Sequence, residues 1–172
     1  MFRKVSLLLL LLITFLSQGV LAQTFSGSQL EGVKIGQCSP LVAEIDAITR
    51  VDDVVTFTFN ITNPTQYQIQ DLRIVAPQSI SKGPQNQVTV VTDNNRNKYM
   101  YVGVGFDGNI TDGGKVNGPL PAGATKQVVI IVHNVGPDVE YLNFNVGAWT
   151  YPRNALQTKG WTFDKVPVPN QN

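Results

Sequence analysis

The chain has few reactive side chains, with one cysteine and one histidine among 172 residues. Cys38 has no second cysteine to pair with, so no internal disulfide can stabilise the fold. One histidine and one cysteine cannot form a zinc site without two carboxylates, and no ligand spacing indicates one. We therefore predict no metal and no cofactor, and a fold that depends on its hydrophobic core. Cys38 is expected to be a half-buried thiol, with an intermolecular disulfide as the alternative.

Charged residues are also scarce, at 15% of the chain, and they do not cluster. Without Arg3 and Lys4, which belong to the N-terminal segment described next, 11 basic side chains remain against 12 acidic ones. Nucleic acid and anionic lipid surfaces both require clustered Lys and Arg. We therefore predict that neither is a partner.

Only one long apolar run is present, and it lies at the N-terminus. A short basic head precedes the run from Val5 to Leu16, and Val20-Leu21-Ala22 has small residues where signal peptidase reads them. The run is short for a membrane span, which favours a cleaved signal. We predict a signal peptide over residues 1–22 and a secreted, extracellular product without membrane insertion. A cut after Gly19 is the alternative.

The remaining sequence shows strand periodicity and no helical stripe. Val54–Thr62 alternates cleanly, with Val55, Phe57, Phe59 and Ile61 on one face and polar residues on the other, which is typical of a half-buried strand. Turn-forming segments separate the runs. The predicted strands are 41–49, 54–62, 67–75, 87–92, 98–106, 126–133, 141–150 and 161–166, with a β-bulge near Gln70-Asp71.

This pattern predicts an all-β fold, an antiparallel immunoglobulin-like β-sandwich of about eight strands. We expect a loose N-terminal lead over residues 23–40, the sandwich domain over 41–166 and a flexible tail over 167–172. The turn "NPTQ", residues 63–66, is expected from Pro64 and Asn63.

Two blocks carry a resemblance to known families. "VVTFTFNITNPTQYQIQDLRI" followed by "LPAGATKQVVIIV" resembles the extracellular immunoglobulin-like superfamily. The same blocks are also similar to β-sandwich cellulose-binding modules. The resemblance covers about residues 54–74 and 120–132 and implies a sandwich fold and extracellular binding. It transfers no site residue to this chain.

Catalysis is not expected. His133 closes a predicted strand, and no G-x-S-x-G turn accompanies it. The acidic residues lie mostly in turns, where no pair can be assigned to the cleft that a glycosidase needs. "DGNITDGG", residues 107–114, offers oxygen ligands but fails the calcium-loop template, so a hairpin loop is expected there.

Two N-glycosylation sequons are present, at Asn60 and Asn109, whereas Pro64 disqualifies Asn63. Asn60 is predicted on the polar face of its strand and Asn109 in a loop. Glycosylation at Asn60 would direct a ligand away from that sheet face.

The last notable pattern is a set of large rings in the outward phase of two strands. If Leu142, Phe144, Val146 and Ala148 are buried, then Trp149 and Tyr151 point outward beside Asn143 and Asn145. If Met100, Val102, Val104 and Phe106 are buried, then Tyr99 and Tyr101 point outward beside Gly103 and Gly105. Flat rings beside amides suit sugars, whose C–H faces stack while their hydroxyls form hydrogen bonds.

The sequence therefore predicts a secreted, non-enzymatic binding or extracellular-matrix glycoprotein. Its ligand-binding residues are predicted to be Tyr99, Tyr101, Asn143, Asn145, Trp149 and Tyr151, with an extracellular polysaccharide or a surface protein as the partner. The alternative for the rings is burial, with Trp161 and Phe163 folded over them. Alternative functions are a structural or adhesion subunit that pairs through a sheet edge or Cys38, and a secreted hydrolase.

Overall fold

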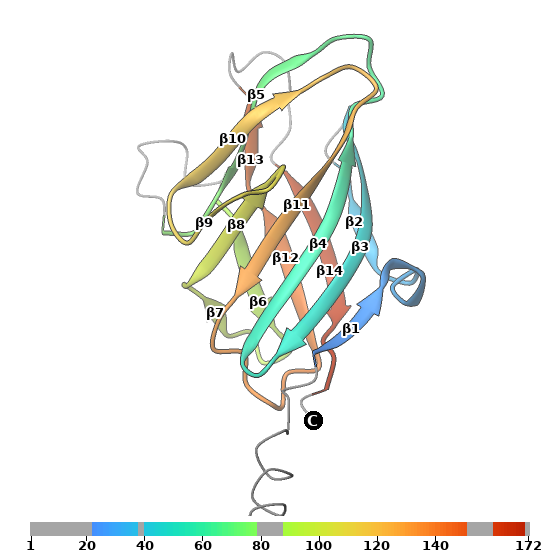
Figure 1. The fold of residues 1–172 in the computed structure, drawn as a ribbon. Helices are drawn as coiled ribbons and strands as arrows, with labels where there is room; N and C mark the ends of the chain where they lie inside the picture. Colours follow the sequence, from blue (N-terminus) through green and yellow to red (C-terminus); the bar gives the residue numbers. More distant parts are fainter. Residues whose placement is uncertain (1–21, 38–39, 79–87, 151–159, 171–172) are drawn as a thin grey trace, which may run out of the picture.

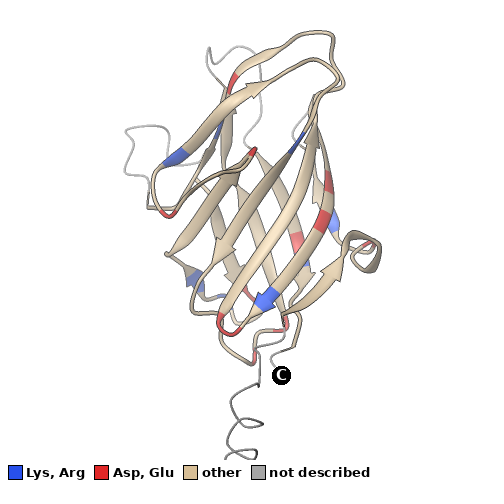
Figure 2. Ribbon diagram, viewed as in Figure 1, with Lys and Arg blue, Asp and Glu red and all other residues tan. Residues whose placement is uncertain are grey.

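The computed structural model describes residues 22–37, 40–78, 88–150 and 160–170. Within these ranges the protein is an antiparallel β-sandwich without an α-helix, which confirms the predicted all-β class. No described helix is long and apolar enough to cross a membrane. Basic and acidic residues are scattered over the described ribbon (Figure 2).

A six-stranded sheet forms the front layer in Figure 1, with strands in the order β1-β3-β4-β11-β8-β9. The strands of this sheet are β1 (Gln23–Ser26), β3 (Val42–Val51), β4 (Val54–Thr62), β8 (Val102–Phe106), β9 (Asn109–Thr111) and β11 (Thr125–Val132).

The second layer consists of two smaller sheets, in the orders β2-β14-β12-β6-β7 and β10-β5-β13. The five-stranded sheet contains β2 (Lys34–Gly36), β6 (Val90–Asp93), β7 (Lys98–Tyr99), β12 (Tyr141–Val146) and β14 (Trp161–Pro167). The three-stranded sheet contains β5 (Ile69–Val75), β10 (Lys115–Leu120) and β13 (Ala148–Thr150). A 3-10 turn, η1 (Gly27–Gln29), follows β1.

The core lies between the layers and is rich in aromatic rings. Phe57, on β4, stacks on Phe144 of β12 with ring centroids 4.4 Å apart, and meets Phe163 of β14 edge-on at 5.0 Å. Phe59 contacts Phe163 and Trp161 at 4.7 and 5.7 Å. Such ring pairs add stabilisation beyond the apolar area they bury. Trp161 and Phe163 therefore belong to the central core and do not form a second core over the outward rings.

The alternation predicted for residues 54–62 is confirmed, because its four inward residues are fully buried. The expected bulge in β5 is also present. Gly118 lies opposite Leu72 while Leu120 lies opposite Ile69, so one extra residue stands on the β5 side around Gln70-Asp71.

The predicted count of about eight strands is wrong, since the described residues form 14. Two predicted strands are each divided, because the chain passes from one sheet to another within them. Four further strands fall in segments expected to be irregular. β9 lies in the segment 107–114, which was expected to be a hairpin loop, and β10 follows it between two predicted strands. β1 and β2 lie in the expected loose lead.

The lead is thus part of the sandwich, because β1 pairs with β3 and β2 pairs with β14. The expected tail is also partly fixed. Val168 is 5% exposed, and its amide donates to the carbonyl of Glu140 at 2.9 Å. Cys38 and the signal segment 1–21 lie outside the described residues.

Candidate functional site

The two predicted strands that carry outward rings each change sheets. In the first, β7 belongs to the five-stranded sheet and β8 to the six-stranded sheet, and Met100 at the crossing is 53% exposed instead of buried. In the second, β12 pairs with β6 and β14, whereas β13 pairs with β5. Tyr99 and Trp149 therefore stand on different sheets, with β7 low and β13 high in Figure 1.

Tyr99 is half-buried against the core, and its hydroxyl donates to Asp93 Oδ2 at 3.2 Å. Burial of Asp93 would raise its pKa. Hydrogen bonds from the Asn97 side chain, the Asn97 and Asn95 amides and the Tyr99 hydroxyl outweigh burial, so the pKa of Asp93 lies below its usual range. Tyr99 thus helps to stabilise a hydrogen-bonded turn through its bond to Asp93.

The same environment makes Tyr99 a distinctive titrating group. Burial, followed by the adjacent negative charge of Asp93, raises the pKa of Tyr99 to about 12. The neutral phenol is favoured in the folded state. Its contribution to stability is therefore complete below the unfolded pKa of about 10 and is lost as the pH rises through about 12.

We expect a tyrosine ionisation step centred near pH 12 when absorbance at 295 nm is followed against pH. Tyr99→Phe should remove this step. A difference between the two titration curves centred near the ordinary tyrosine pKa of about 10 would contradict the environment described for Tyr99.

Tyr101 is the exposed ring of this region, at 70%. It lines a hollow of about 420 Å³, together with Gln78, Asp112, His133 and Asn134. His133 is half-buried at the end of β11, and its amide donates to the Tyr101 carbonyl at 3.4 Å.

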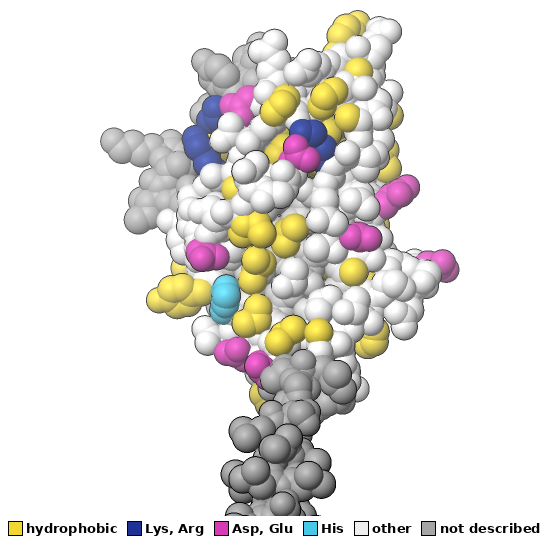
Figure 3. All heavy atoms as spheres, in the orientation of Figure 1, with side chains coloured by type: hydrophobic (Ala, Val, Ile, Leu, Met, Phe, Trp, Pro, Cys, Tyr) yellow, Lys and Arg dark blue, Asp and Glu magenta, His cyan; other side chains and the backbone are white. Residues whose placement is uncertain are grey.

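The glycines of β8 do not leave the sheet uncovered. Gly103 and Gly105 are buried, and an added Cβ would lie 3.3 Å from the Ile131 Cβ and 3.1 Å from the Val129 Cβ, respectively. The glycines instead allow neighbouring side chains to close over the strand. Apolar side chains run down the centre of this face in Figure 3, and Ile110 on β9 is 56% exposed.

Asn143 and Asn145 lie on the outer face of β12, because Leu142, Phe144 and Val146 point into the core. Asn143 Oδ1 accepts the amide of Lys165 at 2.9 Å, where β14 has a positive φ of 54°. Asn143 also lines a groove of about 570 Å³, together with the segment 29–34 and residues of β14. Asn145 is exposed. Neither residue shares a sheet with Trp149, and Tyr151 lies outside the described residues.

Trp149 instead stands in a polar row that crosses the three-stranded sheet. In the strand register it lies opposite Arg73, which in turn lies opposite Asn117. Directly paired residues on one face of an antiparallel sheet are close enough to interact. The guanidinium carbon of Arg73 lies 4.3 Å from the Trp149 ring centroid, within the range of a cation–π contact.

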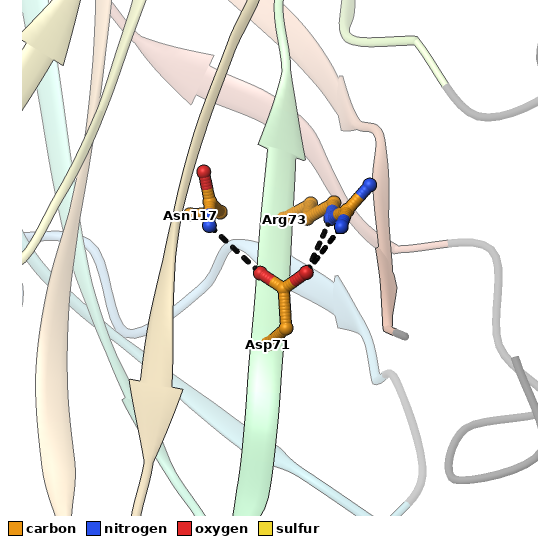
Figure 4. Close-up of polar contacts among 3 residues, drawn as sticks. All are labelled: Asp71, Arg73 and Asn117. Carbon is orange, nitrogen blue, oxygen red and sulfur yellow. Dashed lines mark hydrogen bonds and ion pairs between the residues drawn. The ribbon is translucent and has the colours of Figure 1, made fainter. Parts of the chain in front are cut away.

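Asp71 fixes this row. Its Oδ2 accepts Arg73 Nε at 2.7 Å and also pairs with Nη2, and its Oδ1 accepts Asn117 Nδ2 at 2.8 Å (Figure 4). Burial would raise the pKa of Asp71, but the Arg73 and Asn117 hydrogen bonds and the charge of Arg73 lower it overall. The exposed Lys115 places its Nζ 5.6 Å from the Trp149 centroid. We call this group the tryptophan patch; its members are Asp71, Arg73, Lys115, Asn117 and Trp149.

Of the five predicted ligand-binding residues that the structure describes, Trp149 alone belongs to the tryptophan patch. The sequence analysis missed the other four members. Lys115 and Asn117 were missed because they lie in a segment whose residue types resemble a loop. A signal for Asp71 and Arg73 was present. They occupy the polar phase after the β5 bulge, so "DLRI" places a carboxylate and a guanidinium two residues apart on the outer face.

The two sequons lie on the six-stranded sheet. Asn60 is half-exposed on the outer face of β4. Asn109 is exposed and begins β9, after a two-residue turn in which Asp107 and Gly108 have φ of 51° and 82°. Positive φ at both positions is typical of a tight hairpin turn with an Asp-Gly sequence. Within the described residues, no group of three or more His, Cys, Asp or Glu side chains is placed to hold a metal ion.

No protein-family model matches the chain, and no curated protein matches it significantly. Among solved structures it is similar to the crystal structure of the KRT10-binding region domain of the pneumococcal serine rich repeat protein PsrP. The identity is 13%, and the match covers 84% of this chain and 98% of that chain with a TM-score of 0.42. A likeness at this level assigns neither a family nor a ligand to the chain.

Proposed function

We propose that the protein is a secreted, non-enzymatic binding protein that recognises a polysaccharide through the tryptophan patch. The observation that carries the proposal is the row of Trp149, Arg73 and Asn117 across one sheet face, fixed by Asp71. The secretion signal predicted over residues 1–22 is consistent with an extracellular ligand.

The patch combines the two kinds of group that a sugar needs. The half-buried indole of Trp149 supplies, on the face that Arg73 does not cover, a flat apolar surface for the C–H face of a sugar ring. The polar side chains of the patch supply donors and acceptors for hydroxyl groups. The polar groups are preorganised, because Asp71 bonds to Arg73 on its own strand and to Asn117 on the neighbouring strand. Preorganised groups lose little conformational entropy when a ligand binds.

The same geometry favours binding over hydrolysis. Glycoside hydrolysis uses two carboxyl groups on opposite sides of the scissile bond. The described part of the patch holds one carboxylate, and both of its oxygens are engaged by Arg73 and Asn117. A lowered pKa also suits Asp71 poorly to the role of a general acid at neutral pH.

Trp149→Ala is expected to weaken retention on insoluble polysaccharide at least tenfold, which corresponds to about 1.4 kcal/mol. The measurement is a pull-down of the mature protein on a panel of plant, fungal and bacterial polysaccharides. Tyr67→Ala is the control, because Tyr67 is 71% exposed and lies outside the patch. Circular dichroism melting should show both variants folded at the assay temperature.

Equal retention of the Trp149→Ala variant and the wild type would exclude the patch as the binding surface.

A second candidate function is that of a subunit that pairs with another protein through strand β9. This strand is an edge of the six-stranded sheet and carries the exposed Ile110. Crosslinked oligomers without polysaccharide retention would favour this second function.

A further inference from the structure

Two cations that come from the same side of β13 lie over the Trp149 ring. Arg73 lies on β5 and Lys115 on β10, and these strands follow β13 in the order of the three-stranded sheet. The Arg73 guanidinium carbon is 4.3 Å and the Lys115 Nζ 5.6 Å from the ring centroid. Trp149 and these two positive charges thus occupy one small area.

The one described carboxylate of the patch forms an ion pair with only one of these cations, although the charge of Lys115 also helps to lower the pKa of Asp71. Asp71 Oδ2 is bonded to the Arg73 guanidinium and Oδ1 to Asn117, so neither oxygen is directed at Lys115. Within the described ranges, no carboxylate forms an ion pair with Lys115. The described members of the patch therefore carry two positive charges and one negative charge, with the excess at an exposed ammonium group.

An exposed ammonium beside an aromatic ring can pair with an anionic substituent on a stacked sugar. The Lys ammonium group is a compact point charge with three donors, so it can bind a carboxylate or sulfate group in many orientations. A negatively charged substituent projects from the edge of a sugar ring, where a cation beside the indole can reach it while the C–H face stacks. A neutral sugar would leave the excess charge of the patch unpaired.

Building on the proposed function, we propose that the tryptophan patch selects anionic polysaccharides, with Lys115 contacting the carboxylate or sulfate group of the sugar that stacks on Trp149. Outside the patch, the described basic residues do not cluster. The chain without residues 1–22 is nearly neutral, and Figure 2 shows Lys and Arg scattered along the described ribbon among Asp and Glu. The selection is therefore local, and removing one side chain should remove it.

The test compares polygalacturonate with the same polymer after chemical reduction of its carboxyl groups, using the mature protein and affinity electrophoresis. We expect at least tenfold tighter binding to the carboxylated polymer and a steep loss of that preference as salt is raised. Lys115→Met should reduce binding to polygalacturonate at least tenfold, which removes the preference, and leave binding to the reduced polymer unchanged. Lys115→Arg should retain most of the preference.

Lys98→Met is the matched control. Lys98 is an exposed lysine on β7 of the five-stranded sheet, and its substitution changes the net charge by the same amount. The same measurement is made with dextran sulfate and with uncharged dextran. If the protein prefers dextran sulfate to dextran but does not prefer polygalacturonate to its reduced form, the anionic group is sulfate. Equal binding to charged and neutral polymers, or equal effects of Lys115→Met and Lys98→Met, would overturn the anionic preference. If Trp149→Ala still weakens binding in that case, the proposed function stands without it.

Discussion

Asn63→Asp is expected to lower the free energy of unfolding by about 3 to 5 kcal/mol, although the change replaces one atom of the side chain. Asn63 is fully buried at the end of β4, and its Nδ2 donates to three carbonyl oxygens. These oxygens belong to Tyr67 at 2.8 Å and to Leu120 and Pro121 at 3.2 Å each. A carboxylate at this position would face three acceptors with no hydrogen to donate.

The position connects two turns that are far apart in the sequence. Asn63 Oδ1 accepts the Thr65 amide at 3.1 Å and the Thr65 hydroxyl at 2.7 Å, which closes the 63–66 turn. The Asn63 backbone bonds to Ala124 and Gly123 in the turn before β11. Losing the amide donor therefore disrupts both turns and should destabilise the β4–β11 pair at the centre of the front sheet.

Asn60→Asp is the matched control, because Asn60 lies on the outer face of the same strand and the chemical change is identical. Urea unfolding followed by circular dichroism should show a change of no more than about 0.5 kcal/mol for this variant. The defect of Asn63→Asp should decrease at acid pH, where the new carboxyl group is protonated and can donate once. Similar stabilities for the two variants at neutral pH would contradict the role given to the Asn63 amide.

Phe57→Ala is the second large expected effect, with a loss of about 3 to 5 kcal/mol in the free energy of unfolding. Phe57 is fully buried, and its ring contacts the rings of Phe59, Phe144 and Phe163 at centroid distances of 5.7, 4.4 and 5.0 Å. Since Phe144 and Phe163 belong to the other layer, the truncation opens a cavity between the layers.

Phe25→Ala provides the comparison, since Phe25 on β1 packs against the edge of the core and is half-exposed. Its loss should cost about 1 kcal/mol in the same unfolding assay. With no disulfide inside the chain, the aromatic core carries much of the stability of this sandwich. A Phe57→Ala variant no less stable than Phe25→Ala would refute that view of the core.

The inner face of β4 could be predicted from the sequence, because its alternation of Val, Phe and Ile with Thr and Asn is uninterrupted. The buried phases of residues 102–106 and 142–148 were predicted correctly for the same reason. The changes of sheet at residues 100–101 and at Gly147 were not visible in the sequence. At Gly147 the chain stays in the same layer, so Val146 and Ala148 are both buried and the phase shows no break. At residues 100–101 the chain crosses to the other layer and the phase does break, since Tyr99 packs against the core while Met100 is exposed. Local periodicity indicates which residues of a strand are buried, but it does not indicate which strand pairs with it in the sheet.

The tryptophan patch illustrates the consequence for the candidate site. Trp149 was predicted as a binding residue from its phase alone, but its neighbours come from β5 and β10. β10 contains Asn117-Gly118-Pro119, residue types that predict a turn, and only its pairing with β5 makes it a strand. No local pattern connects residues 71, 73, 115 and 117 to residue 149. Their association depends on the order of strands in the sheet.

The most direct test of ligand contact at the patch is a fluorescence titration of Trp161→Phe, in which Trp149 is the one remaining tryptophan. Soluble oligosaccharides from a polymer that retains the protein should produce a saturable shift or quenching of Trp149 emission. The Trp149→Phe variant, which keeps the buried Trp161, should show no change. Unchanged Trp149 emission at oligosaccharide concentrations that release the protein from the polymer would contradict the account.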